Sequence, residues 1–125
     1  MKVLDSSALL AFLFREEGAE LVAKTIDQSC MSAVNLCEVI GRFTREGHDH
    51  EKVSRRIATS SIEIVPFGVA DASLAASLVP TTRHLGLSLG DRACLALAMS
   101  RKLPALTADR VWADIEIDVQ VVVVR

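Results

Sequence analysis

The chain has 125 residues, half of them hydrophobic, and a formal charge of −2. This length suits one hydrophobic core, so we expect a single domain over residues 1–125. The balanced charge neither requires nor excludes a nucleic-acid partner. No stretch approaches the roughly 20 apolar residues of a membrane span, and the first residues lack a secretory pattern. Three widely spaced cysteines fit a disulfide framework poorly, so we expect a cytoplasmic protein.

Short apolar runs alternate with amphipathic segments in the first half of the chain. A strand is predicted at residues 2–4, and Ser6 and Ser7 offer N-cap hydroxyls to a helix over 8–14. The elements expected next are a helix over 18–27, a strand at 30–31 and a helix over 33–47. The unit of strand followed by helix therefore repeats.

The second half continues this alternation. We expect helices over 50–60 and 69–79, with a strand at 62–65 between them that ends before Pro66. Pro80 starts or kinks the next turn, and the helix over 87–102 is apolar nearly all round, so it should be central. Strands are predicted at 104–107 and 119–124, the second a β-branched run suited to burial. Such alternation predicts an α/β fold with a parallel sheet covered by helices.

Two acidic residues directly follow predicted strands, and two more lie in the helices that come after strands. Asp5 and Asp109 follow the strands at 2–4 and 104–107, which places both at the edge where parallel sheets bind ligands. Glu38 lies in the helix over 33–47 between the apolar Cys37 and Val39, where we expect it to be partly buried, and Asp91 begins the long apolar helix. The four acids are therefore expected to converge at one edge of the sheet.

Each of these acids also has a purely structural interpretation. Asp5 suits a turn or an N-cap, and Glu38 has Arg42 four residues later as an ion-pair partner. Asp91 stands three residues after Ser88, in the arrangement of a capping box. The combination decides between the two interpretations, because four converging carboxylates repel one another unless cations or shared protons lie between them.

Oxygen ligands without His or Cys suit Mg²⁺ or Mn²⁺, and one or two such ions favour chemistry at phosphate groups. We therefore predict that Asp5, Glu38, Asp91 and Asp109 are metal ligands and catalytic residues. Asp114 and Asp118 lie near the last of these and are alternatives that replace or assist Asp109.

Four stretches together resemble the PIN domain over the whole chain: Val-Leu-Asp-Ser-Ser-Ala-Leu-Leu-Ala, Ser-Ala-Val-Asn-Leu-Cys-Glu-Val, Leu-Ser-Leu-Gly-Asp-Arg-Ala-Cys-Leu-Ala-Leu-Ala and Leu-Thr-Ala-Asp-Arg-Val-Trp. The small size resembles the VapC-type toxins of toxin–antitoxin pairs. The resemblance implies a three-layer α/β/α sandwich with a mainly parallel sheet, and a metal-dependent endoribonuclease that leaves 5′-phosphate and 3′-hydroxyl ends on RNA. It also implies a homodimer and a small VapB-like antitoxin.

The resemblance carries metal ligation over to Asp5, Glu38, Asp91 and Asp109. It makes Ser6, Asn35 and Thr107 the hydrogen-bonding partners that support these ligands. Arg92 and Arg110 each follow a predicted ligand and are candidates for phosphate contacts.

Other enzyme classes fit the residues less well. A haloacid-dehalogenase phosphatase needs a second Asp where Ser7 stands, and a receiver domain needs a phosphoacceptor Asp where Pro66 and Phe67 stand. A P-loop is absent. The open alternative is a catalytically inactive PIN-like module whose acidic cluster docks a basic partner.

Overall fold

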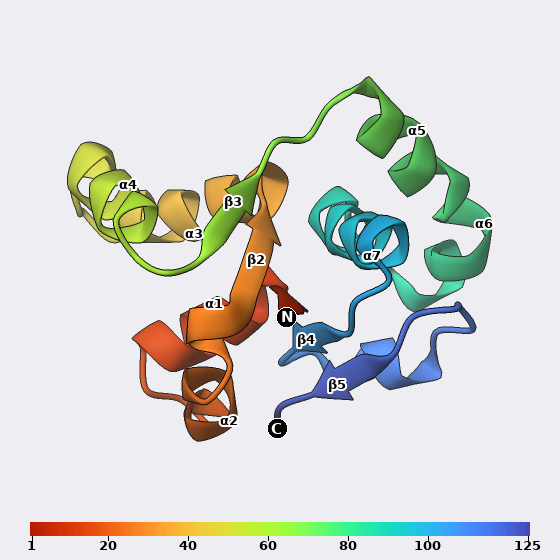
Figure 1. The fold of residues 1–125 in the computed structure, drawn as a ribbon, viewed down its shortest axis with the longest axis horizontal. Helices are drawn as coiled ribbons and strands as arrows, with labels where there is room; N and C mark the ends of the chain where they lie inside the picture. Colours follow the sequence, from red (N-terminus) through yellow and green to blue (C-terminus); the bar gives the residue numbers. More distant parts are fainter.

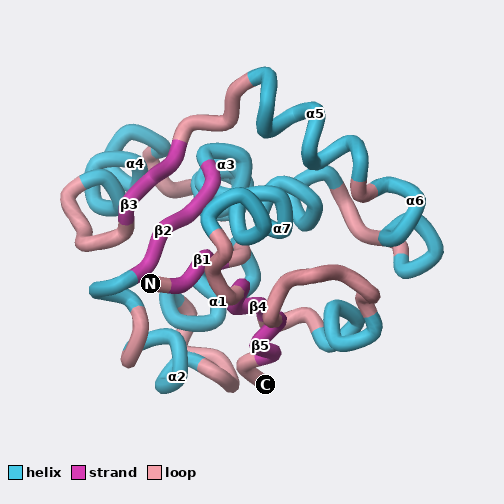
Figure 2. The backbone as a smooth tube through the Cα atoms, turned by 45° about the vertical axis from the view of Figure 1, so that its right-hand side comes forward, coloured by secondary structure: helices cyan, strands magenta, loops and turns pink.

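The computed structural model describes residues 1–125 and contains one parallel sheet of five strands, in the order β3-β2-β1-β4-β5. The strands are β1 (Lys2–Leu4), β2 (Ser29–Ser32), β3 (Glu63–Val65), β4 (Ala105–Thr107) and β5 (Val121–Val123). They lie side by side with β1 in the middle (Figure 2). The predicted parallel sheet is thereby confirmed, and helical segments form every crossover between successive strands.

Helices cover both faces of the sheet (Figure 1). On one side lie α1 (Ser6–Leu13), α2 (Ala19–Ala23), α3 (Ala33–Arg45) and α4 (His50–Ala58), and on the other α5 (Val69–Ser77), α6 (Val79–Thr82) and α7 (Leu89–Arg101). Strand side chains alternate between the two sides. Val3, Cys30 and Ala105 are in register and share a core with α5 and α7, whereas Leu4, Met31 and Leu106 pack with α1 to α4. The three-layer α/β/α sandwich is therefore as predicted.

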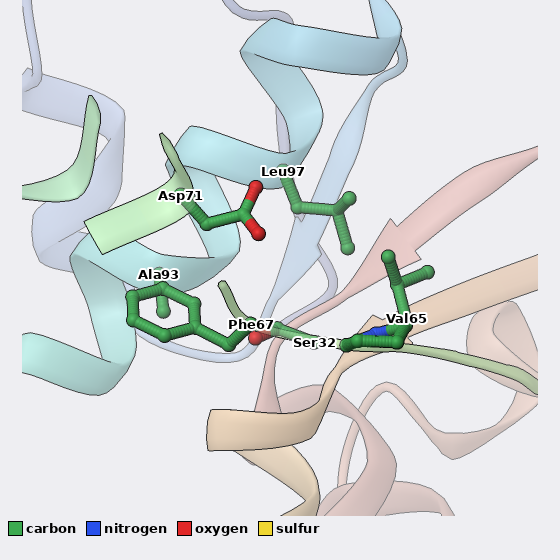
Figure 3. A pocket seen from close by; sticks show the side chains of 7 residues that line it. Ser32, Val65, Phe67, Asp71, Ala93 and Leu97 are labelled. Carbon is green, nitrogen blue, oxygen red and sulfur yellow. The ribbon is translucent and has the colours of Figure 1, made fainter. Parts of the chain in front are cut away.

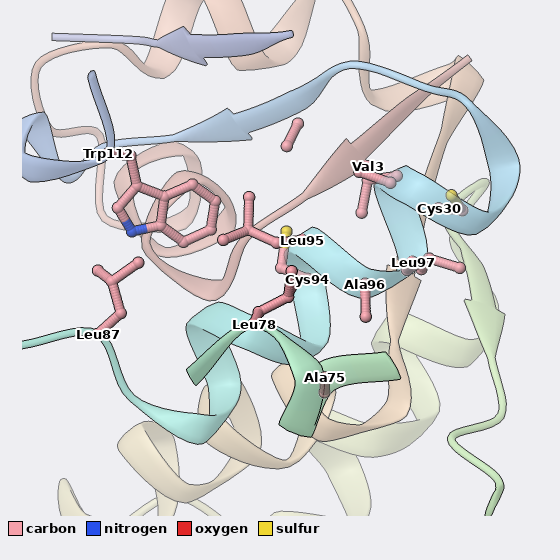
Figure 4. Close-up of a cluster of buried hydrophobic side chains, with 12 residues drawn as sticks. Val3, Cys30, Ala75, Leu78, Leu87, Cys94, Leu95, Ala96, Leu97 and Trp112 are labelled. Carbon is pink, nitrogen blue, oxygen red and sulfur yellow. The ribbon is translucent and has the colours of Figure 1, made fainter. Parts of the chain in front are cut away.

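The long helix α7 forms the centre of one of the two cores, as its apolar sequence predicts. All six residues over 93–98 are buried. Leu95 and Cys94 pack among Leu78, Leu87 and the fully buried indole of Trp112 (Figure 4). The first turn of α7 is thereby fixed relative to the sheet, so it can hold a side chain at a defined place.

Three sequence predictions about local structure were wrong. The helix expected over 18–27 is instead the short α2 followed by a 3₁₀ turn at Ile26–Gln28. The run at 119–124 was expected to be buried, but β5 is a half-buried edge strand because only β4 pairs with it. The N-cap of α1 is Asp5 rather than a serine, since the Asp5 carboxylate accepts the backbone N–H of Ser7 at 3.4 Å, which confirms the structural interpretation of Asp5 as an N-cap. No helix combines the length and apolar character needed to span a membrane.

Candidate active site

The candidate site lies at the carboxyl edge of the sheet, where the chain changes direction about β1. Strands β2 and β3 extend the sheet to one side of β1, and β4 and β5 extend it to the other. Crevices at such a switch point are the usual ligand sites of parallel sheets. Asp5 follows β1 directly, Thr107 ends β4, and α3 begins immediately after β2.

Asp5 is 2 % exposed and is held through one of its two carboxylate oxygens. Its Oδ2 accepts the hydroxyl of Ser7 at 2.5 Å and that of Thr107 at 3.0 Å. These hydroxyl oxygens in turn accept the backbone N–H of Ala108 at 2.9 Å and of Asp109 at 3.1 Å. The other oxygen, Oδ1, is buried and has no hydrogen-bond partner. Asp5 therefore presents one fixed, unsatisfied acceptor, which is costly unless a ligand or a proton occupies it.

The environment disfavours the ionised form of Asp5. The pKa of its carboxyl group is raised from 3.8 to about 6, chiefly by burial and in smaller part by the negative charges of Asp91 and Glu38. The hydrogen bonds from Ser7 and Thr107 act in the opposite direction and lower the pKa. Asp5, Glu38 and Asp91 thus share one electrostatic field, which a bound cation would relieve.

Glu38 reaches the site from α3 and is exposed, so its predicted partial burial was wrong. Its Oε1 accepts the Ser6 hydroxyl at 2.8 Å and the amide of Asn35 at 3.1 Å. Arg42, the partner in the structural interpretation, pairs instead with Glu46 at 3.1 Å. Glu38 is therefore held by hydrogen bonds from the two residues expected to support the ligands, while their role towards a metal stays a prediction.

Asp91 lies in the first turn of α7, next to Gly90. The predicted capping box is confirmed, because Asp91 Oδ2 accepts the Ser88 N–H at 2.8 Å and Ser88 Oγ accepts the Asp91 N–H at 3.2 Å. The fully buried Asn35 donates its other amide proton to the Gly90 carbonyl at 3.0 Å. The Glu38 carboxylate lies directly against Gly90. One asparagine thus ties α3 to the start of α7.

Asp109 is joined to the other acids less directly. Its N–H contacts Thr107, and its carboxylate accepts the N–H of Val111 at 3.0 Å at the start of a 3₁₀ helix, Arg110–Asp114. Of the alternatives, Asp118 lies near Lys102 before β4, at the opposite edge of the sheet, and Asp114 lines a separate surface hollow. These positions favour Asp109 among the three.

The two arginines proposed for phosphate contacts are partly engaged within the protein. Arg92 Nη1 donates to the Leu87 carbonyl at 2.8 Å, and Arg110 Nε donates to the Arg125 carbonyl at 3.2 Å. Their contact with phosphate stays a prediction.

The donor set fits a hard divalent cation. The side chains as they lie bring no three Asp, Glu, His or Cys residues close enough to share an ion. Asp5 nevertheless offers a buried, unpartnered oxygen, and the Asp91 and Glu38 carboxylates lie within electrostatic reach of it. Carboxylate oxygens without nitrogen or sulfur donors are what Mg²⁺ and Mn²⁺ prefer.

Sequence reasoning missed two residues of the site. Ser7 was interpreted only as a cap, although its position two residues after Asp5 was a signal that its hydroxyl could reach back to that carboxylate. Gly90 gave no signal, because nothing in the sequence showed that Glu38 would pack against it.

The hollow beside the site is small. At the carboxyl ends of β2 and β3, a cavity of about 10 Å³ lies among Ser32, Val65, Phe67, Asp71, Ala93 and Leu97 (Figure 3). This volume holds about one water molecule. A large substrate would therefore lie across the open edge of the sheet rather than in this hollow.

Comparisons with known proteins agree with this fold. A family model described as the PIN domain matches residues 2–118. The structure of Mycobacterium tuberculosis VapC20, a sarcin-ricin loop cleaving toxin, superposes with a TM-score of 0.75 at 15 % identity, covering 96 % of this chain and 99 % of that one.

Two further structures belong to complexes. A toxin–antitoxin complex from Klebsiella pneumoniae superposes with a TM-score of 0.70 at 19 % identity, covering 96 % of this chain and 99 % of that one. FitAcB from Neisseria gonorrhoeae gives 0.70 at 19 % identity, covering 97 % and 96 %. A sequence search of curated proteins found no match. The family match over nearly the whole chain shows that this protein belongs to the PIN-domain family, whose members are generally nucleases.

Proposed function

We propose that this protein is a Mg²⁺- or Mn²⁺-dependent endoribonuclease that acts as the toxin of a toxin–antitoxin pair. The observation that carries the proposal is the buried Oδ1 of Asp5, which has no partner and lies in the field of Asp91 and Glu38. Family membership supports nuclease chemistry, and the residues at this edge are the type that hold one or two hard cations.

The residues of the chain divide the work in a way that follows from their contacts. Ser7 and Thr107 hold Oδ2 of Asp5, which leaves the unpartnered Oδ1 as the proposed ligand atom. Glu38 and Asp91 are more exposed than Asp5 and provide acceptors at the open side of the site. A bound divalent cation supplies a water molecule of lowered pKa and neutralises charge on the scissile phosphate. Asp109 completes the proposed ligand set from the end of β4.

RNA is the proposed substrate because the family resemblance implies it and the open edge suits a long chain. The formal net charge of the chain is −2, and the four proposed ligands contribute four negative charges to it. Without these four carboxylates, which bound cations would neutralise, the rest of the chain has a formal charge of about +2. That balance favours approach of a polyanion once the site is filled. Cleavage is expected to leave 5′-phosphate and 3′-hydroxyl ends, and an RNA substrate implies action in the cytoplasm.

The proposed partners are a small VapB-like antitoxin and a second copy of the chain. The similarity to a Klebsiella pneumoniae toxin–antitoxin complex and to FitAcB supports the antitoxin. We infer that a tail of the antitoxin blocks the acidic edge, since a basic segment complements three or four carboxylates.

The test is cleavage of purified transfer, ribosomal and messenger RNAs by antitoxin-free protein in Mg²⁺ or Mn²⁺, with EDTA as the chelator control. Asp91→Asn is expected to abolish cleavage while the fold is retained. Asp71→Asn is the matched control, because Asp71 holds the same position in the first turn of α5 and accepts the N–H of the N-cap residue Gly68 at 2.8 Å. Loss in both variants would point to helix capping rather than to metal ligation.

The alternative is an inactive module whose acids only dock a basic partner. It predicts that wild type and Asp91→Asn treat every RNA alike, while Asp91→Asn weakens binding of a basic peptide. Chelator-sensitive cuts that disappear in the variant exclude this alternative.

A further inference from the structure

We propose that Gly90 is a positioning residue for Glu38. Because Gly90 has no side chain, the first turn of α7 leaves space for the Glu38 carboxylate, and we call this space the carboxylate seat. This inference rests on the proposed function for its meaning, because it assigns Gly90 the task of keeping one ligand carboxylate in place.

The Glu38 carboxylate occupies the space that a side chain on Gly90 would fill. A Cβ built on Gly90 would overlap the Cδ and both carboxylate oxygens of Glu38. Gly90 itself is buried, and it is not among the glycines with positive φ. The backbone therefore does not require glycine at this position. Room for the Glu38 carboxylate is what requires it.

Three hydrogen bonds hold the contact together, one from Ser6 of α1 and two from Asn35 of α3. The Ser6 hydroxyl and the Asn35 amide both donate to Glu38 Oε1, at 2.8 Å and 3.1 Å. The second Asn35 amide proton goes to the Gly90 carbonyl at 3.0 Å. Asn35 is 0 % exposed, so this link between the carboxylate and the helix turn is fixed by packing.

The effect of adding a methyl group at Gly90 depends on whether the Glu38 side chain or helix α7 moves more easily. Glu38 is exposed, and its carboxylate is the far end of a flexible side chain, whereas α7 is locked in the core. Gly90→Ala should therefore keep the fold and displace the carboxylate. Alanine also favours a helix more than glycine does, so the urea midpoint should not fall.

Gly41 provides the matched control. It lies in α3, three residues after Glu38, and nothing stands within 4 Å of a Cβ built on it. Gly41→Ala makes the same chemical change in a helix, and its added methyl group does not contact the Glu38 carboxylate. Any difference between the two alanine variants then reports the contact with Glu38.

The first readout needs neither metal nor RNA. In NMR spectra of ¹⁵N-labelled protein, the Asn35 side-chain amide is assigned by its absence in Asn35→Asp. In Gly90→Ala the proton bonded to Glu38 should move to its position in Glu38→Ala, and the proton bonded to the Gly90 carbonyl should stay. An unmoved Glu38-bonded proton would overturn the inference, as would a Gly90→Ala chain that does not fold.

The second readout is the affinity for MnCl₂ by titration calorimetry. Gly90→Ala should bind Mn²⁺ about 10- to 100-fold more weakly than wild type, as expected when a supporting contact of a ligand is lost. Gly41→Ala should match wild type. In a Glu38→Ala background, Gly90→Ala should cause no further loss, because it acts only through Glu38.

An additive loss in the double variant would overturn the inference. A wild-type protein that binds no Mn²⁺ and cleaves no RNA would refute the proposed function instead, and the Asn35 amide would still decide whether Gly90 positions Glu38.

Discussion

Replacing Asp5 by Asn should change how the stability of the protein depends on pH. Burial, together with the charges of Asp91 and Glu38, raises the pKa of this carboxyl from 3.8 to about 6 in the folded chain. A difference of about 2.2 pKa units corresponds to about 3 kcal/mol. Because the folded state holds the proton more tightly than the unfolded state, the free energy of unfolding falls as pH rises from about 4 through 6, and the cost is fully present above pH 7.

The measurement is urea unfolding of both proteins in EDTA at pH 4 and pH 8. All other ionisable groups are present in both proteins. The difference between their changes in unfolding free energy from pH 4 to pH 8 therefore reports the Asp5 carboxyl group and its interactions. Wild type should lose about 2.5 kcal/mol more than Asp5→Asn between these two pH values, because the unfolded carboxyl is already partly ionised at pH 4. Any constant cost of the buried amide cancels in this comparison.

A divalent cation provides the complementary test. At pH 8, Mn²⁺ at about 100 times its dissociation constant should stabilise wild type by about 2.7 kcal/mol and leave Asp5→Asn unchanged. Parallel pH profiles for the two proteins would refute the assigned burial and charge effects. An equal response to Mn²⁺ would refute Asp5 as a ligand.

Four further substitutions test contacts around the site and elsewhere in the fold. Ser7→Ala removes the hydroxyl that donates to Asp5 and accepts a backbone N–H, so urea unfolding should show a loss of about 1–3 kcal/mol. Gly18→Ala should lower the thermal midpoint more than Gly47→Ala does: both have positive φ, at +96° and +90°, but only at Gly18 would a Cβ meet another residue, at 2.7 Å. Arg125→Gln should weaken the proposed RNA cleavage without lowering stability by more than about 1 kcal/mol, because the exposed guanidinium holds the carbonyl beside Asp109 at 3.2 Å. Cleavage at the wild-type rate would show that this segment needs no such support.

The sheet, its layers and the edge at which Asp5 lies could be predicted because they follow from periodicity. Apolar runs of two to six residues separated by amphipathic segments leave few alternatives to a parallel sheet with helices on both faces. The acids after β1 and β4 were placed by the same logic, since the carboxyl ends of parallel strands share an edge. The capping box of Asp91 was readable because it spans only four residues.

What the sequence did not predict depends on contacts between distant residues. The exposure of Glu38 and its seat against Gly90 join α3 to α7, and no local pattern encodes the distance between these helices. The half-buried state of β5 depends on its being an edge strand, which the order of the strands decides and its β-branched composition does not. The partial engagement of Arg92 by a backbone carbonyl likewise appears only when the chain is folded.

The link between β1 and β4 also bears on when the site comes into existence during synthesis. The Thr107 hydroxyl contacts Asp5 across 102 positions, and the Ala108 N–H contacts Ser7 across 101. A ribosome releases Asp5 and Glu38 long before the strand that orients Asp5, and Asp91 shortly before it, and such distant pairings form late. An abandoned fragment that ends before β4 would carry three of the four acids and no ordered site. On the proposed function, incomplete chains of this protein would therefore have no nuclease activity.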